Sequence, residues 1–360
     1  MSSIDSVPST RPAKRARTDG HDMTDASFIH SPDVWMDDGN IVLQTTEGAT
    51  HTMYKVHKST LAHTSGFFRA LFYGSKDALE AGSEHYEGVP VLAMPDDADD
   101  VREWLMAIYS FRPLHRLVTQ TDHRIVSRFP DPFDSLLRIA TKYECEALRE
   151  SCVRLLMQEF PTKLEDWDDR ERVALEMTHD EAWSDPMHII RLATDCDVPD
   201  ALPLAFYDAA TLIELEGDNR RELELSLLTS ADLVALIRGR SQLRSRFLRF
   251  VARSATDLNN EHRRNDICDL TSCEEVLEDL WTGFNPVTMA DAERARDPLN
   301  FMKARAQKIY SSNSFKKSLC PLCQKWLRGV IHEFRQAMWA SLPNAFGLDG
   351  RVSVEWDEPL

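Results

Sequence analysis

Long apolar runs are missing from this 360-residue chain. No stretch approaches the roughly 20 consecutive apolar residues that a membrane-spanning helix requires. The opening segment, MSSIDSVPSTRPAKRARTDG, also lacks the apolar core of a secretory signal. We therefore expect an intracellular protein of the nucleus, the cytoplasm or both. In those compartments its seven cysteines are reduced thiols or metal ligands rather than a disulfide framework.

Glycine and positive charge are also scarce. The 13 glycines include no Gly-rich phosphate loop, which argues against a nucleotide-binding enzyme. A formal net charge of −17 argues against broad nucleic-acid binding, because phosphate contacts require a concentrated positive surface. The exception is a basic cluster near the N-terminus, formed by Arg11, Lys14, Arg15 and Arg17. A nuclear-import signal and a solvated, disordered tail both account for it.

The chain is long enough, and at 42% hydrophobic residues apolar enough, for two or three domains. Order is predicted to begin near Phe28. Two alternating runs, 41–45 and 52–57, are separated by Glu-Gly-Ala and predict a β-hairpin. The apolar side chains that share a face within each run are Ile41 and Leu43, then Tyr54 and Val56. A third strand is predicted in GVPVLAMPDD, with Pro90 either at a sheet edge or just before the strand begins at Val91.

Helical periodicity accounts for most of the rest. A short helix around Leu61 is followed by a second that Ser65 caps, and a third helix is predicted from Asp99. Further helices are predicted around 136–143, 148–156, 189–196, 199–215, 230–251, 291–310 and 324–340. The segments LLRIATKYECEAL and IIRLATDCDVPDAL, at 136–148 and 189–202, resemble each other. Each predicts a helix, a polar turn and a second helix, which we attribute to convergence rather than duplication.

The order of these elements resembles a BTB/POZ domain, most closely the version found in large families of fungal BTB proteins. The resemblance covers about residues 30–160. The residues that carry it are His57, Lys58, Leu61, Ser65, Phe68, Leu71, Phe72, Tyr109, Leu137, Ala140, Tyr143, Leu148 and Cys152. For that region it implies an α+β fold, with a small sheet flanked by helices, and the periodicity beyond about residue 160 predicts an all-helical C-terminal region. The expected divisions are a disordered tail at 1–27, the BTB/POZ domain at 28–160, a BACK-like helical region at 161–258, a cysteine-containing helical region at 259–350 and a tail at 351–360.

The resemblance implies a homodimer that forms through an apolar face built from the first strand and helix. We expect a non-catalytic interaction adaptor or scaffold, with a possible link to ubiquitin-ligase recruitment through a cullin. The glutamate of cullin-binding BTB domains matches only Glu80, with Ala78 in the place of its hydrophobic neighbour, and the loop 112–131 is longer than usual. A nuclear transcriptional co-regulator is the alternative, and a cysteine- or zinc-dependent hydrolase is a remote one.

His57 lies where the second strand meets the first helix. An imidazole at that junction can satisfy open backbone groups. No nearby serine, cysteine or carboxylate spacing places it in a catalytic triad. In the family, this histidine ends the second strand and helps to set the turn into the helix, so we interpret it as architectural.

The strongest chemical signal is a set of four cysteines, Cys268 and Cys273 in DICDLTSC and Cys320 and Cys323 in SLCPLC. A C-x2-C pair directs two thiolates towards one metal ion, and a second pair would complete a four-cysteine zinc site. Such a site is structural, because four protein ligands leave no position for an activated water.

Two alternatives to the four-cysteine site stay open. His262 or His332 can replace one of the cysteines as a ligand. In the other interpretation all four thiols are small buried side chains beside helix starts, which is common for free cysteine. The remaining cysteines, Cys145, Cys152 and Cys196, are predicted to be core residues.

Overall fold

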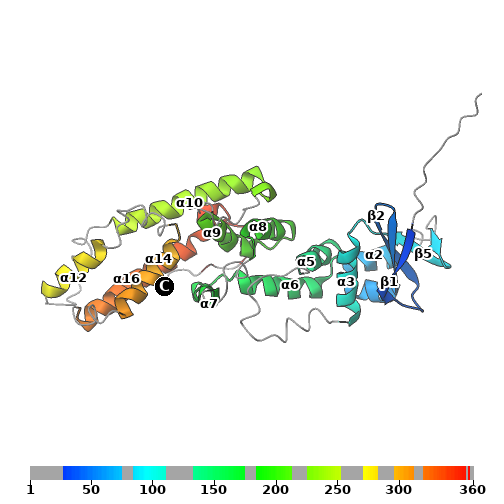
Figure 1. Cartoon of the computed structure of the whole chain (residues 1–360), viewed down its shortest axis with the longest axis horizontal. Coiled ribbons are helices and arrows are strands. Elements are labelled where there is room, and N and C mark those ends of the chain that lie inside the picture. The colour runs from blue at the N-terminus through cyan, green and yellow to red at the C-terminus, as the bar shows by residue number, and fades with distance from the viewer. Residues whose placement is uncertain are drawn as a thin grey trace, which may run out of the picture.

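The computed structural model describes residues 27–74, 84–110, 133–174, 184–212, 225–252, 271–282, 296–311, 319–353 and Trp356. They form an α+β molecule that is drawn out along one axis (Figure 1). A sheet with its helices lies at one end, and the C-terminal helices extend away from it to α12 at the other.

The sheet has five strands. They are β1 (Ser27–Trp35), β2 (Ile41–Glu47), β3 (Thr50–Val56), β4 (His85–Tyr86) and β5 (Val89–Ala93), in the order β1-β3-β2-β5-β4. The predicted hairpin is confirmed as β2 and β3, in which Leu43 lies opposite Tyr54. Strand β5 runs parallel to β2 from Val91 onwards, and Pro90 pairs only with β4. The proline, which has no N–H to donate, therefore lies outside the ladder with β2.

Five helices complete this end of the molecule. They are α1 (Lys58–Thr64), α2 (Gly66–Tyr73), α3 (Ala98–Ser110), α5 (Phe133–Lys142) and α6 (Glu146–Glu159). Helix α3 packs against β1 and β2, and α5 packs against α3 and α6. The predicted cap is confirmed, because the Ser65 hydroxyl accepts a hydrogen bond from the N–H of Phe68. That hydroxyl also donates to the carbonyl of Tyr143, 78 residues away, and so ties α2 to the end of α5. The shared core includes Ile41, Leu43, Tyr54, Phe68, Val101, Trp104, Leu137 and Cys152.

The two similar segments form the same turn. Helices α5 and α8 each end before an acidic residue with a positive φ, 52° at Glu144 and 53° at Asp197. In each turn the next N–H donates to the carbonyl five residues earlier, and the pairs are Cys145–Ala140 and Val198–Ala193. These are left-handed C-terminal caps. The predicted pattern of helix, polar turn and helix is confirmed at both places.

The C-terminal part is helical. Its elements are α7 (Leu164–Ala174), α8 (Pro186–Asp195), η1 (Pro199–Ala201), α9 (Leu202–Leu212), η2 (Leu225–Leu227), α10 (Ser230–Val251), α12 (Thr271–Thr282), α14 (Pro298–Ser311), α16 (Pro321–Ala340) and α17 (Leu342–Phe346). Helix α10 begins at the predicted residue, where Thr229 and Asp232 form a capping box. It packs against α9, α14, α16 and α17, so contacts run across the expected division at residue 258.

A partly buried ion-pair cluster fastens the last helices to α7. The guanidinium of Arg335 in α16 donates to both carboxylate oxygens of Asp168, over 2.9 and 2.6 Å, and Lys303 in α14 lies 2.9 Å from the same carboxylate. Burial alone would raise the pKa of Asp168, but the hydrogen bonds and charges of Arg335 and Lys303 lower it. The paired, ionised form of Asp168 therefore holds three helices that are distant in sequence.

The expected role of the His57 side chain is wrong in one respect. His57 precedes α1, but its imidazole makes no capping hydrogen bond to that helix. Its backbone N–H donates instead to the hydroxyl of Tyr109 over 2.9 Å, and its ring lies against Tyr109 and Asp38. The side-chain oxygen of Asn40 accepts a hydrogen bond from the backbone N–H of Lys58. The junction is thus closed by side chains that approach from outside the helix.

Several predictions concern positions that lie outside the described residues. These are the basic cluster at 11–17, the loop 112–131, and Ala78, Glu80, His262 and Cys268. No helix in the described ranges combines the length and apolarity needed to cross a bilayer.

Candidate functional site

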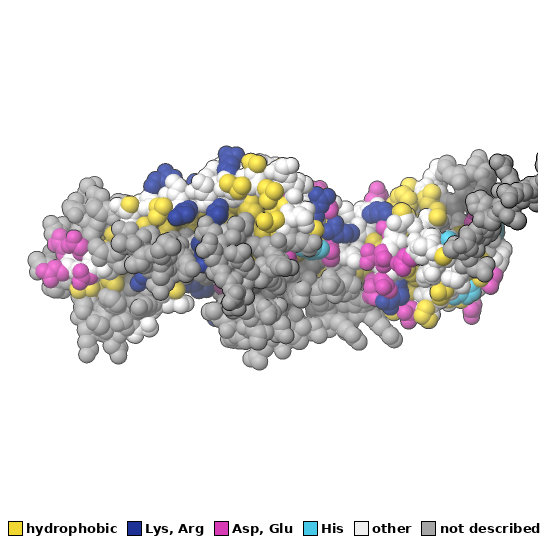
Figure 2. All heavy atoms as spheres, turned by 45° about the horizontal axis from the view of Figure 1, so that its top comes forward, with side chains coloured by type: hydrophobic (Ala, Val, Ile, Leu, Met, Phe, Trp, Pro, Cys, Tyr) yellow, Lys and Arg dark blue, Asp and Glu magenta, His cyan; other side chains and the backbone are white. Residues whose placement is uncertain are grey.

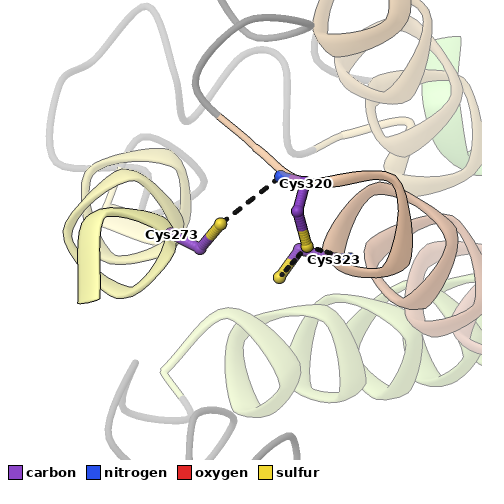
Figure 3. A group of neighbouring side chains, drawn as sticks. All are labelled: Cys273, Cys320 and Cys323. Carbon is purple, nitrogen blue, oxygen red and sulfur yellow. Dashed lines mark hydrogen bonds between the residues drawn. The ribbon is translucent and has the colours of Figure 1, made fainter. Parts of the chain in front are cut away.

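Three of the four predicted cysteine ligands come together at the end of the molecule that lies far from the sheet. The sulfur atoms of Cys273, Cys320 and Cys323 all lie within 4.8 Å of one another (Figure 3). Cys273 belongs to α12, whereas the other two open α16. Cys273 and Cys323 are buried and Cys320 is half-buried. Two segments whose cysteines are 47 residues apart in the sequence, Cys273 and Cys320, thus bring three thiols close together.

The C-x2-C segment adopts this geometry because it forms the start of a helix. Cys320 is the residue before the first turn of α16, and its sulfur accepts the N–H of Cys323 over 3.4 Å. Pro321 occupies the first helical position, where its missing N–H costs nothing and its fixed φ suits the helix. The two sulfurs are 3.3 Å apart as a result.

Helix α12 supplies the third thiol. The backbone N–H of Cys320 donates to the sulfur of Cys273 over 3.3 Å, which places the two chain segments in direct contact. On the next turns of α12, Trp281 packs against Phe250 of α10 with ring centres 5.2 Å apart, and Phe250 stacks on Phe334 of α16 at 3.9 Å. This aromatic contact sets the distance between α12 and α16.

The arrangement suits a soft divalent metal ion. Zn–S bonds of about 2.3 Å in a tetrahedron place neighbouring sulfurs about 3.8 Å apart, close to the spacing found here. The positive end of the α16 dipole favours negative charge at its first residues, so it stabilises the thiolate forms that bind metal. The group can therefore bind a metal ion through three cysteines.

Of the two histidine alternatives, His332 is wrong. It follows Cys323 by nine residues on the same helix, which separates them by about 13 Å along the axis, and it is exposed. An imidazole cannot bridge that distance to a shared ion. Cys268 and His262 lie outside the described residues, so the fourth ligand stays a prediction. The described part of the group contains neither a histidine nor a carboxylate, which a hydrolytic site needs as a base.

The other cysteines belong to the core, as predicted. Cys145, Cys152 and Cys196 are each at most 2% exposed. Burial raises the pKa of Cys152 to about 12, and the neighbouring Cys196 adds to the effect. Such a thiol is protonated at neutral pH and is a poor nucleophile or metal ligand.

A second surface feature was not anticipated from the sequence. Strand β1 pairs with β3 at one edge of the sheet, and Phe28 and Ile29 on it are 54% and 50% exposed. The sheet curls so far that β1 also meets β4, the strand at the other edge, through a 2.8 Å contact between His30 and Tyr86. The signal available in the sequence was the spacing of Phe28 and His30, which are two residues apart and would share one face of a strand. Pro32 in the same segment argued against a strand there.

Comparison with protein-family models, curated proteins and solved structures found no match to this chain.

Proposed function

We propose that the chain is a non-catalytic protein-interaction scaffold whose residues 28–160 form a BTB/POZ-like domain that pairs with a second copy of itself. The observation that carries the proposal is the order of elements. Hairpin β2–β3 is followed by α1 and α2, then by β5 parallel to β2, then by α3, α5 and α6. This is the order expected of the domain that the sequence resembles.

The exposed apolar side chains of this unit support the pairing. Phe28 and Ile29 lie on the edge strand β1, while Phe67 and Tyr73 of α2 are 41% and 65% exposed. An edge strand with exposed apolar side chains is a template for another chain. A stable dimer buries roughly 800 Å² on each partner, which a strand and a helix together can supply.

Light scattering of the full chain at micromolar concentration tests the pairing. The expected mass is about twice the 41.2 kDa of one chain. Substitution of Ile29 by aspartate should return the mass of a single chain, whereas Val234→Asp, at an even more exposed apolar site in α10, should leave the dimer intact. A single-chain mass for the unmodified protein would contradict the proposal.

In the same proposal the three-cysteine group holds a structural zinc ion, with Cys268 as the fourth ligand. The convergence of Cys273 with the C-x2-C pair supports it, because packing alone has no need of three thiols within 4.8 Å. Zinc then joins α12 to the start of α16 and catalyses nothing. A closed four-cysteine site has no open position for substrate or water.

Metal analysis of the purified chain is the direct test. We expect one zinc ion per chain, lost in Cys320→Ser and in Cys268→Ser and kept in Cys196→Ala, which changes a core cysteine. A metal-free protein, or one whose intact mass is 2 Da low because Cys320 and Cys323 have formed a disulfide, would contradict the zinc assignment.

A further inference from the structure

The outer face of α10 is apolar and exposed. Val234 and Ile237 are 65% and 69% exposed, and Leu248 further along is 39% exposed. Their helical spacing places them on one stripe about 21 Å long, the length of four helical turns. The opposite face of α10 is buried, because its residues pack against α9, α14, α16 and α17. The buried residues of that inner face are Leu236, Gly239, Leu243, Phe247 and Val251.

The same helix is rich in arginine, and Arg238 and Arg244 flank the apolar stripe. Between Leu233 and Val251 the sequence contains five arginines and no carboxylate. Four of them are exposed, namely Arg238, Arg244, Arg246 and Arg249. Over the described ranges, none of these four forms an ion pair with a carboxylate. The one nearby acid, Asp232, is used in the cap of the helix with Thr229.

This concentration of charge is local, because the whole chain carries a net charge of −17. Burial and the positive charges of Arg244 and Arg296 lower the pKa of Arg240, which shows that cations are crowded along this helix. Figure 2 shows apolar and basic side chains intermingled over the region of α10, whereas acidic side chains gather at the α12 end of the molecule and over the part that holds the sheet.

We propose that this stripe, defined by Val234, Ile237, Arg238, Arg244 and Leu248, binds an acidic amphipathic helix of a partner protein. The apolar side chains of such a helix would cover Val234, Ile237 and Leu248. Carboxylates along its flanks would pair with the arginines, which favour bidentate contacts. The inference deepens the proposed scaffold function and rests on it, because it names the partner class that the C-terminal helices hold.

Two other polyanionic partners fit the stripe less well. A nucleic acid would pair with the arginines but would gain nothing from the exposed side chains of Val234 and Ile237, and the net charge of the chain would repel it. An anionic membrane requires a helix that can bury a broad apolar face, but the broad apolar face of α10 is packed inside the protein.

The test uses the full-length chain and a fluorescein-labelled 18-residue peptide. The peptide carries leucines at helical spacing and glutamates elsewhere, and a control peptide of the same composition has its leucines shuffled. Anisotropy should report binding of the first peptide and not the second. Ile237→Asp and Arg244→Glu should each weaken binding roughly tenfold, as expected for the centre of an interface. Arg154→Glu on the exposed face of α6 should leave binding unchanged.

Three results would overturn the proposal. The peptide does not bind, both peptides bind equally, or Ile237→Asp binds as well as the unmodified chain. Tighter binding of a 20-base-pair duplex or of phosphatidylserine vesicles, lost in Arg244→Glu, would also overturn it in favour of a polyanion site. Circular dichroism of each variant verifies folding. Light scattering of the same samples reports self-association separately. Failure of the proposed dimer can therefore be distinguished from failure of the proposed helix-binding stripe.

Discussion

At the residue scale, Gly239 shows how closely the C-terminal helices pack. A Cβ atom at this position would lie 2.1 Å from the ring of Phe346. That ring is 2% exposed and stacks on Phe206, so it has no room to move aside. Gly239→Ala should therefore lower the free energy of unfolding by about 1–3 kcal/mol, the usual cost of overpacking, even though alanine improves helix propensity by up to about 1 kcal/mol. Urea denaturation measures the change.

The matched control for that substitution is Gly329 in α16, where a Cβ would meet nothing within 4 Å. Gly329→Ala should raise the free energy of unfolding by about 0.5–1 kcal/mol, because only helix propensity changes. Equal effects at the two glycines would show that α10 and α17 are not packed as described.

Glu171 in α7 carries the clearest pH-dependent contribution. Its carboxylate accepts a hydrogen bond from Asn300 over 2.8 Å. Burial raises the pKa of Glu171 to about 7, against the opposing charge of Arg170, and the nearby carboxylates Asp208 and Asp297 raise it further. The folded protein therefore holds a proton that the unfolded chain has released above its ordinary pKa of 4.5.

The sign of the effect follows from this difference. Between pH 4.5 and about 7 the folded state binds more protons, so stability falls as pH rises through that window. At about 1.4 kcal/mol for each pH unit, the full loss is on the order of 3 kcal/mol. Glu171→Gln keeps the acceptor for Asn300 and should abolish the loss, so the variant should be the more stable protein at pH 8 and equal to the original near pH 4.5. Urea denaturation across this range tests it.

Glu165→Gln, at an exposed position in the first turn of the same helix, is the control for Glu171. It removes one acidic charge without changing a buried group, so comparison of the two variants isolates the effect of the buried carboxylate. If Glu171→Gln shows the same slope as the original chain, the buried carboxylate is not the group that titrates.

At the element scale, the predictable parts are those with local signals. Thr229 fixed the start of α10, Ser65 fixed that of α2, and alternation located the hairpin. Strand β1 was missed because its parallel pairing with β3 is long-range and most of its side chains are exposed. Helix α12 was missed although Cys273, Leu277 and Trp281 recur every four residues, a spacing typical of a helix.

The same distinction applies to the cysteine group. The C-x2-C pair and its turn could be predicted, since Cys320 and Cys323 are three residues apart. Cys273 was among the predicted ligands, but its spacing alone does not establish its approach to that pair, because the approach depends on the packing of Phe250 between Trp281 and Phe334. Spacing gives the chemistry of such a site, but tertiary packing decides which ligands share it.

Helix α12 should respond to metal removal more than its neighbours do. Its described contacts with the rest of the chain include the thiol group and the contact of Trp281 with Phe250, so loss of zinc would remove one of its anchors. We expect chelation to speed hydrogen exchange of the α12 amides at least tenfold, with the amides of Leu236–Leu243 in α10 unchanged. The measurement is hydrogen exchange with peptide-level mass spectrometry.

The Cys320→Ser variant provides the control for that experiment. Its α12 amides should exchange rapidly from the start, and chelator should have no further effect on them. Rapid exchange in both proteins before chelation, or slow exchange in both after it, would show that the thiol group does not hold α12 in place.

At the scale of the whole molecule, the sheet unit joins the C-terminal helices through charged contacts between α5 and α8. Asp134 lies 2.6 Å from the imidazole of His188, and Arg138 lies 2.8 Å from Asp195. Arg149 in α6 adds hydrogen bonds to the carbonyls at the end of α8, on Cys196 and Asp197. The helices in this junction belong to the two similar segments, 136–148 and 189–202. These segments therefore contact each other where the sheet unit meets the C-terminal helices.

The His188–Asp134 contact should make the junction sensitive to pH. The hydrogen bond with Asp134 raises the pKa of His188, while His188 and Arg138 lower the pKa of Asp134 against the effect of burial. The histidine therefore stabilises the fold fully below its ordinary pKa of 6.5 and loses this effect as pH rises through its raised value. Since the side chain of His188 is 42% exposed, we expect only about 0.5–1 kcal/mol. His188→Ala should thus destabilise the chain at pH 6 more than at pH 9, as measured by urea denaturation at both. His63→Ala, at an exposed histidine on α1, is the matched control, and a pH-independent effect at His188 would mean that its charge does not hold the two parts together.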